Sequence, residues 1–206
     1  MGKSRPGARV ARFRGVCCSM NSRPCPGRRA VLKGGFGWGI GLGLAPALMA
    51  QDPTSARPAA GDLLVRVEDA LPTPLGPQDV VAGTPVMAWP MDPVNGTVRS
   101  GSRLNRVLLL RLDPERLAPA TKERAAEGVV GYTAICTHTG CEVTDWLGVE
   151  QLLKCACHAS KFDPSDGGRV IEGPAPRTLP ALPLVSEDGR LVVARPFTSR
   201  VGFETA

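Results

Sequence analysis

The sequence predicts an all-β, antiparallel fold for the greater part of this 206-residue chain. The chain has 24 glycines and 20 prolines but only 4% aromatic residues, a composition that favours turn-rich β structure over a helix bundle. From residue 62 onward the apolar runs are short, and turn-forming residues separate them. The length is sufficient for one domain with a hydrophobic core and an additional tail.

The predicted strands follow one another along the chain with turns between them. The segment "SEDGR" at 186–190 is predicted to form a hairpin turn. Residues 113–128 are compatible with a short helix, which Pro119 is expected to interrupt. The strands themselves are expected at 63–67, 85–89, 106–112, 129–135, 150–155, 168–172, 182–185 and 191–194.

The N-terminus has the composition of an export leader. Residues 1–33 contain nine of the 25 basic side chains and none of the 19 acidic ones, so the remaining residues carry a net charge of −3. Arg28 and Arg29 precede 17 uncharged residues at 34–50, a layout that resembles a twin-arginine signal. The uncharged segment is predicted to form a signal or anchor helix, either cleaved after export or retained in the membrane. Because the positive charge lies in the leader, nucleic-acid binding is not expected.

Met20 would open a leader of ordinary length, so translation is expected to begin there rather than at Met1. The given sequence is predicted to have four parts. The parts are a basic leader with the twin-arginine motif at 1–33, a hydrophobic signal or anchor segment at 34–50, a linker at 51–61 rich in Pro and Ala, and a β domain at 62–206.

The only two histidines of the chain lie beside cysteines, in "CTHTGC" at 136–141 and "CACHAS" at 155–160. Thiolate and imidazole groups gathered in two short stretches indicate a metal site. A structural zinc site usually pairs cysteine with cysteine and histidine with histidine at wider spacing. A zinc-stabilised exported binding module is nevertheless kept as an alternative.

The two stretches resemble the cluster-binding loops of high-potential Rieske iron–sulfur proteins. The resemblance covers about 131–195, and the cluster-binding loops would lie at about 131–177. It implies a Rieske-type antiparallel β-sandwich with a small cluster-binding subdomain and one 2Fe–2S cluster per chain. The ligands that it implies are Cys136 and Cys155 on one iron, and His138 and His158 on the other.

The same resemblance implies roles for further residues. Cys141 and Cys157 would form a disulfide, which needs an oxidising compartment. Ser160 would donate a hydrogen bond to a bridging sulfide and raise the reduction potential. Phe162 stands where cytochrome bc-type relatives usually have tyrosine, so a potential in the upper half of the range of about −150 to +300 mV, but not at its top, is expected. "GPAP" resembles the proline loop that covers the cluster and comprises Gly173, Pro174, Ala175 and Pro176.

The resemblance implies electron transfer rather than catalysis by this chain alone. The first hypothesis is the iron–sulfur subunit of a quinol–cytochrome c oxidoreductase, with cytochrome b, a c-type cytochrome and quinol as partners. It would lie on the periplasmic side of a bacterial inner membrane, attached through residues 34–50 if these are retained. The alternative is the small Rieske subunit of a periplasmic molybdenum oxidase beside a molybdopterin subunit, because "FDPSDGG" and "AWPMDP" are similar to the arsenite oxidase small subunit.

Overall fold

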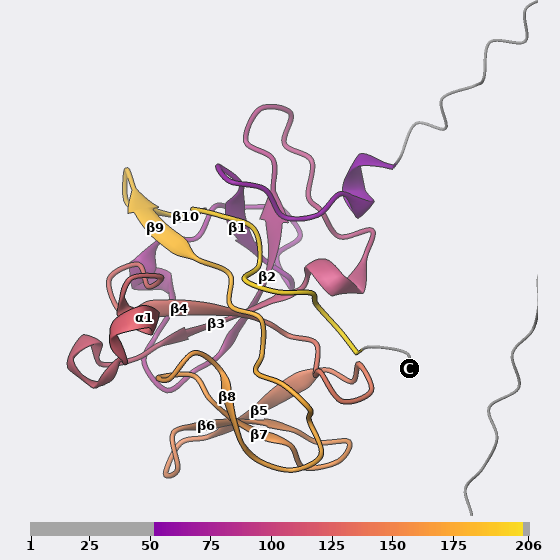
Figure 1. Cartoon of the computed structure of the whole chain (residues 1–206). Coiled ribbons are helices and arrows are strands. Elements are labelled where there is room, and N and C mark those ends of the chain that lie inside the picture. Colours follow the sequence, from indigo (N-terminus) through magenta and orange to yellow (C-terminus); the bar gives the residue numbers. More distant parts are fainter. Residues whose placement is uncertain (1–51, 204–206) are drawn as a thin grey trace, which may run out of the picture. The chain divides into compact units, whose positions relative to one another are not determined.

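The computed structural model describes residues 52–203 of the chain, so the predicted leader and the hydrophobic segment 34–50 lie outside the described residues. Within the described part, ten strands form two antiparallel sheets (Figure 1). This arrangement confirms the all-β antiparallel prediction. The strands are β1 (Leu63–Arg66), β2 (Val86–Met91), β3 (Val107–Arg111), β4 (Val129–Thr133), β5 (Val143–Leu147), β6 (Leu152–Cys155), β7 (Lys161–Asp163), β8 (Arg169–Glu172), β9 (Leu184–Glu187) and β10 (Arg190–Val193).

The larger sheet has six strands in the order β4-β3-β2-β1-β10-β9. It curls until β4 meets residues 180–182, where the Thr133 amide donates to Pro180 O at 2.9 Å and the Leu182 amide to Gly131 O at 2.9 Å. Every residue of β4 is buried as a result. The interior is filled by aliphatic side chains that include Leu64, Val86, Val107, Leu109, Val129, Leu184 and Leu191.

The smaller sheet has four strands in the order β5-β6-β7-β8, all from one continuous stretch of chain between β4 and β9. Figure 1 shows these strands gathered at one end of the described part, next to β3 and β4. The two sheets share a hydrophobic cluster that includes Leu108, Leu110, Val130, Tyr132, Val143, Leu153 and Phe162. The two loops that carry the cysteines and histidines lie in this smaller unit.

The sequence predictions differ from the structure in two of the smaller strands and in one helix. Strands β5 and β7 were not expected, since "VTDWL" mixes polar and apolar residues and β7 has only three residues. Pro119 begins the short helix α1 (Pro119–Lys122) rather than interrupting a helix. A proline is tolerated there because the first helical residue has no intrahelical partner for an amide hydrogen.

The predicted hairpin at 186–190 is present. β9 and β10 pair directly, and Asp188 and Gly189 form the turn with φ angles of 49° and 71°. Two successive residues with positive φ are typical of the tight turns that match the twist of a hairpin.

The predicted linker at 51–61 stays a prediction, but its described residues contact the domain. The Gly101 amide donates to Thr54 O at 2.9 Å, and the Gly61 amide to Val193 O at 2.9 Å. The buried Asn105 side chain donates to Ala56 O at 2.7 Å. Short 3₁₀ turns at Pro53–Ser55, Pro77–Asp79, Arg103–Asn105 and Pro114–Arg116 complete the described elements.

Candidate metal centre

Each cysteine- and histidine-bearing loop is a closed turn of six residues. The first loop, 136–141, follows β4, and the Cys136 amide donates to Cys141 O at 2.7 Å. The second loop, 155–160, joins β6 to β7, and the Cys155 amide donates to Ser160 O at 2.9 Å. Both loops therefore have fixed ends, and the residues between those ends are held at one end of the strands β5, β6 and β7.

The four candidate ligands converge in two pairs. Cys136 and Cys155 are free thiols with 1% and 2% of their surfaces exposed. The Nδ1 atoms of His138 and His158 lie 3.2 Å apart, and the rings stand edge to face. Two imidazole nitrogens on one tetrahedral metal at about 2.1 Å would lie about 3.4 Å from each other. The distance between the Nδ1 atoms therefore fits a single metal atom held by both histidines. The Cys155 side chain interacts with the Cys136 thiol, so these two cysteines are neighbours at the site.

The two pairs differ in their exposure to solvent. The cysteine side chains are enclosed, whereas His158 is exposed and His138 is half-buried. Burial raises the pKa of Cys136 to about 11, since a thiolate without a bound cation is poorly solvated there. A metal would replace that proton, because thiolate is the form that binds metal ions.

A disulfide joins the two loops between Cys141 and Cys157. Their sulfur atoms and that of Cys155 all lie within 4.8 Å of one another. Because the two bonded sulfurs have no thiolate to offer, only Cys155 of these three is available to a metal. The disulfide is the pair that the family resemblance implies.

The segment 173–176 packs against the second loop. Gly173 has a φ of 93°, and a Cβ atom there would lie 2.5 Å from the Ser160 Cα. The Ala175 amide donates to Ser160 Oγ at 3.2 Å, with both residues buried. Because the hydroxyl oxygen accepts this bond, its own proton is left to donate elsewhere. The hydroxyl also lowers the pKa of the Cys136 thiol, although burial has the larger, opposite effect.

Phe162 is completely buried beneath the second loop. It pairs with Leu153 on β6 and with Val170 on β8, and it belongs to the cluster between the two sheets. Its ring supplies packing but no hydroxyl group. The position is thus occupied by a core residue, a role that was not predicted from the sequence.

Several residues that support the loops were missed from the sequence. The fully buried Thr137 hydroxyl donates to Arg177 O at 2.7 Å and so ties the first loop to the chain after the proline loop. The buried Tyr132 hydroxyl donates to Pro164 O at 2.8 Å and ties β4 to the turn between β7 and β8. Threonine, tyrosine and arginine are common in all folds, so no local pattern marks these contacts.

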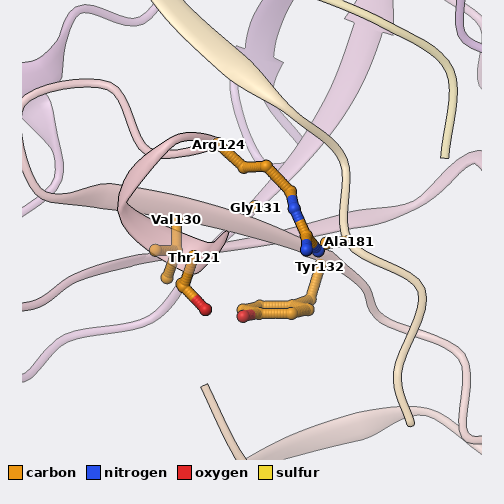
Figure 2. Close-up of a pocket in the computed structure, with 6 residues that line it drawn as sticks. All are labelled: Thr121, Arg124, Val130, Gly131, Tyr132 and Ala181. Atoms are coloured by element: carbon orange, nitrogen blue, oxygen red, sulfur yellow. The ribbon is translucent and has the colours of Figure 1, made fainter. Parts of the chain in front are cut away.

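The surroundings of Tyr132 do not form a ligand site. Figure 2 shows the Thr121 side chain directed toward the hydroxyl end of the Tyr132 ring, with Arg124 reaching toward Ala181. The space between these side chains is too small to admit a water molecule. Burial raises the pKa of Tyr132 well above its ordinary value. This region is a packed joint between the two sheets.

Within residues 52–203, none of the helices has the length and apolar character that crossing a membrane requires. The family model for the Rieske [2Fe-2S] domain matches residues 112–183, a range that contains both loops and the proline loop. The chain is similar to the cytochrome bc1 complex Rieske iron-sulfur subunit of Streptomyces lividans, with 34% identity over 146 residues, 69% of this chain and 85% of that protein.

Two further comparisons cover shorter parts. A putative respiratory nitrate reductase subunit Rieske of Haloferax mediterranei is 39% identical over 106 residues, which are 50% of this chain and 47% of that protein. The soluble domain of Rieske protein II (soxF) from Sulfolobus acidocaldarius has a TM-score of 0.35 at 20% identity, and the likeness covers 46% of this chain and 65% of that one. The chain thus spans most of the Streptomyces lividans protein but less than half of the Haloferax protein.

Proposed function

The chain belongs to the Rieske [2Fe-2S] protein family, and we propose that it is the electron-transferring iron–sulfur subunit of a quinol–cytochrome c oxidoreductase. The family membership implies a 2Fe–2S cluster, which supplies one-electron transfer when it is bound. The observation that carries the proposal is the placement of two buried thiols behind two imidazoles whose Nδ1 atoms lie 3.2 Å apart.

In the proposed arrangement Cys136 and Cys155 would bind one iron, and His138 and His158 would bind the other through Nδ1. The two neutral imidazoles give the site less negative charge than four thiolates would, which favours acceptance of an electron. Each ring then keeps its Nε2 away from the metal. At the exposed His158 this nitrogen is placed to exchange a hydrogen bond or a proton with a partner molecule.

The remaining residues of the site exclude water and hold the loops. The Ser160 hydroxyl, which accepts from the Ala175 amide, is free to donate toward sulfur and so favours the reduced state. The Cys141–Cys157 disulfide holds the two loops together. The segment 173–176 closes over Ser160, because Gly173 approaches it without a side chain.

Location and partners form part of the proposal. Disulfides persist in oxidising compartments, so the Cys141–Cys157 bond supports export to the periplasm. The twin-arginine pattern at Arg28 and Arg29 supports the same route, although it lies outside the described residues. Residues 34–50 would attach the chain to the inner membrane if they are retained. The relative from Streptomyces lividans is named a subunit of a cytochrome bc1 complex, which supports cytochrome b and a c-type cytochrome as partners.

A second candidate is the Rieske subunit of a periplasmic molybdenum oxidase. The similarity to a putative nitrate reductase Rieske subunit favours it, since that protein is not named as part of a bc1 complex. The buried Phe162 also favours it, because the phenolic donor usual in cytochrome bc-type relatives is missing. In this case the subunit would relay electrons without meeting a quinol.

Purification of the native complex distinguishes the two candidates. The full chain is produced in its own membrane with an affinity tag that contains no histidine, and the co-purifying subunits are identified by mass spectrometry. We expect a cytochrome b and a c-type cytochrome, together with quinol-dependent reduction of the cytochrome. A molybdopterin subunit without quinol activity would contradict the proposal in favour of the second candidate. A colourless, zinc-loaded protein would contradict both.

A further inference from the structure

The last described residues form a strap that runs beside the first ligand loop. We define the C-terminal strap as residues 198–203. Its first residue is fixed to the segment before β9, since the Thr198 amide donates to Ala181 O at 2.9 Å and the Ala181 amide donates to Thr198 Oγ1 at 3.0 Å. Val201 is buried with 6% of its surface exposed. The strap therefore packs on the domain even though it contains no helix or strand.

Arg177 connects the strap to the ligand loop. Its guanidinium group donates from Nη1 to Arg200 O at 2.7 Å and from Nη2 to Gly202 O at 2.5 Å. Its own carbonyl accepts from the buried Thr137 hydroxyl at 2.7 Å. Thr137 stands between Cys136 and His138, and Arg177 directly follows the proline loop. One residue thus holds the ligand loop through its backbone and the strap through its side chain.

A second contact joins the strap to the same loop. Gly140 has a φ of 80°, and a Cβ atom there would lie 2.9 Å from Phe203 Cδ1. The Arg103 guanidinium also lies next to Gly140 and donates to Gly140 O. Phe203 and Gly140 line one side of a cleft of about 500 Å³ that Leu104 and Ile135 also line. The loop is therefore held at two points, at Thr137 by Arg177 and at Gly140 by Arg103 and Phe203.

We propose that Arg177 is a positioning residue for the cluster ligands. It holds the first loop, 136–141, the proline loop and the C-terminal strap together as one unit. The inference deepens the proposed function and rests on it, because it takes Cys136 and His138 as ligands. Hydrogen bonds from a charged guanidinium group are stronger than those between neutral groups. The two carbonyls that Arg177 holds belong to a segment without regular structure, so no strand or helix hydrogen bonds hold them. The clamp keeps Cys136 and His138, the ligands on either side of Thr137, in place. Its loss should displace these ligands without unfolding the rest of the protein.

The test compares variants of the full, cluster-loaded chain. Arg177→Ala removes the guanidinium, Arg177→Lys keeps one charged donor, and a chain that ends at Thr198 removes the segment that Arg177 holds. Arg200→Ala is the matched control, since Arg200 takes part in the clamp through its backbone carbonyl. The measurements are the rate of cluster release to a chelator, followed by visible absorbance, amide hydrogen exchange at residues 137–140, and the EPR spectrum of the reduced protein.

For Arg177→Ala we expect cluster release about tenfold faster, which corresponds to about 1.4 kcal/mol. Exchange should quicken at residues 137–140 but not in β1 and β10, and the EPR line should broaden. Arg177→Lys should restore part of the effect, and Arg200→Ala should resemble the wild type. The truncation should release the cluster at least as fast as Arg177→Ala, because it also removes Val201 and Phe203. Adding Arg177→Ala to the truncation should cause no further change, because the carbonyls that Arg177 holds are then already absent.

Three results would contradict the proposal that Arg177 positions the ligands. They are a wild-type release rate in Arg177→Ala, faster exchange throughout the larger sheet as well, and full additivity with the truncation. Failure of the ligand assignment that the inference takes from the proposed function looks different, because the wild-type chain itself would then show no EPR signal of a cluster with nitrogen and sulfur ligands. In that case the exchange at residues 137–140 still decides whether Arg177 holds the loop.

Discussion

The larger sheet and the smaller sheet are stabilised in different ways. In the larger sheet, all five residues of β4 and four of the five in β3 are buried. In the smaller sheet, β8 has no buried residue and β7 has one. The smaller sheet instead has a disulfide, a Lys161 side chain paired with Glu150 and Glu172, and the Tyr132–Pro164 hydrogen bond.

The difference shows how a site of irregular loops is held by a small protein. Burial of apolar area stabilises the larger sheet through many weak contacts, so the loss of any one contact is spread over the whole fold. The smaller sheet buries fewer of its side chains, among them Val143, Leu153 and Phe162, and is also held by single bonds at fixed points. Substitutions in the larger sheet should therefore change global stability, while those in the smaller sheet should change the site.

The largest expected effect comes from the interior of the larger sheet. Leu109 on β3 is completely buried, and Leu109→Ala should lower the free energy of unfolding by about 2–5 kcal/mol. The visible spectrum of the folded protein should not change, because Leu109 lies in the interior of the larger sheet and not in the cluster that contains Cys136 and Cys155. Denaturant unfolding followed by circular dichroism measures the first quantity.

The control for this substitution is Val149→Ala in the turn between β5 and β6, where the side chain is fully exposed. It should change the free energy of unfolding by less than about 0.5 kcal/mol. An altered cluster spectrum in Leu109→Ala at unchanged stability would refute the division of roles between the sheets.

Removal of the disulfide should give the next largest loss of stability, and this loss should affect the smaller sheet. The bonded cysteines are 16 residues apart, and a closed loop of that length contributes about 3 kcal/mol. The double variant Cys141→Ser, Cys157→Ser leaves no unpaired thiol from this pair. We expect amide exchange to quicken across residues 136–160 and the cluster to be lost, while β1 and β10 keep their protection. Simultaneous loss of protection in both sheets would mean that they unfold as one unit.

Tyr132 joins the two sheets, so removal of its hydroxyl group tests how much this contact contributes to stability. Tyr132→Phe leaves the buried Pro164 carbonyl without this donor and should cost about 1–3 kcal/mol. The chain has one tyrosine, so an absorbance titration reports Tyr132 alone. Because burial raises its pKa, no phenolate should appear near the ordinary value of about 10 while the protein is folded. Phenolate absorbance at pH 10 in the native protein would show that the joint is open to solvent.

The smallest expected change in stability accompanies a change in potential. Ser160→Ala removes a hydroxyl that is free to donate toward sulfur, and the midpoint potential should fall by something on the order of tens of millivolts. The Ala175 amide also loses its acceptor, at a cost of about 1 kcal/mol. Protein-film voltammetry measures the potential. Ser165→Ala is a control on the turn between β7 and β8, and an identical midpoint in Ser160→Ala and the wild type would exclude Ser160 from tuning the cluster.

The difference between the sheets explains part of what the sequence revealed, although β6 and β8 of the smaller sheet were also expected, at 150–155 and 168–172. The strands of the larger sheet have clear apolar runs, and each of β1, β2, β3, β4, β9 and β10 was expected near its observed position. Strand β5 was missed because Thr144 and Asp145 interrupt its pattern, and a bulge shifts its register there. Period and propensity identify strands that bury a continuous face, which β5 does not have.

At the site, the residues with rare chemistry were predictable and their supports were not. The two histidines and four neighbouring cysteines stood out because the chain has only two histidines and both lie beside cysteines. Thr137, Tyr132 and Arg177 act through a single hydroxyl or a carbonyl brought near by the fold. Such contacts depend on tertiary distance, which no spacing in the sequence encodes.

The most direct test of the central claim is pulsed EPR on the reduced chain labelled with ¹⁵N-histidine. Because His138 and His158 are the only histidines in the chain, every strongly coupled ¹⁵N nucleus must come from them, provided that the affinity tag contains none. The account predicts two strongly coupled nitrogens in the wild type and the loss of one coupling, or of the cluster, in His138→Cys and in His158→Cys. A cluster without coupled ¹⁵N, or no paramagnetic cluster at all, would contradict it.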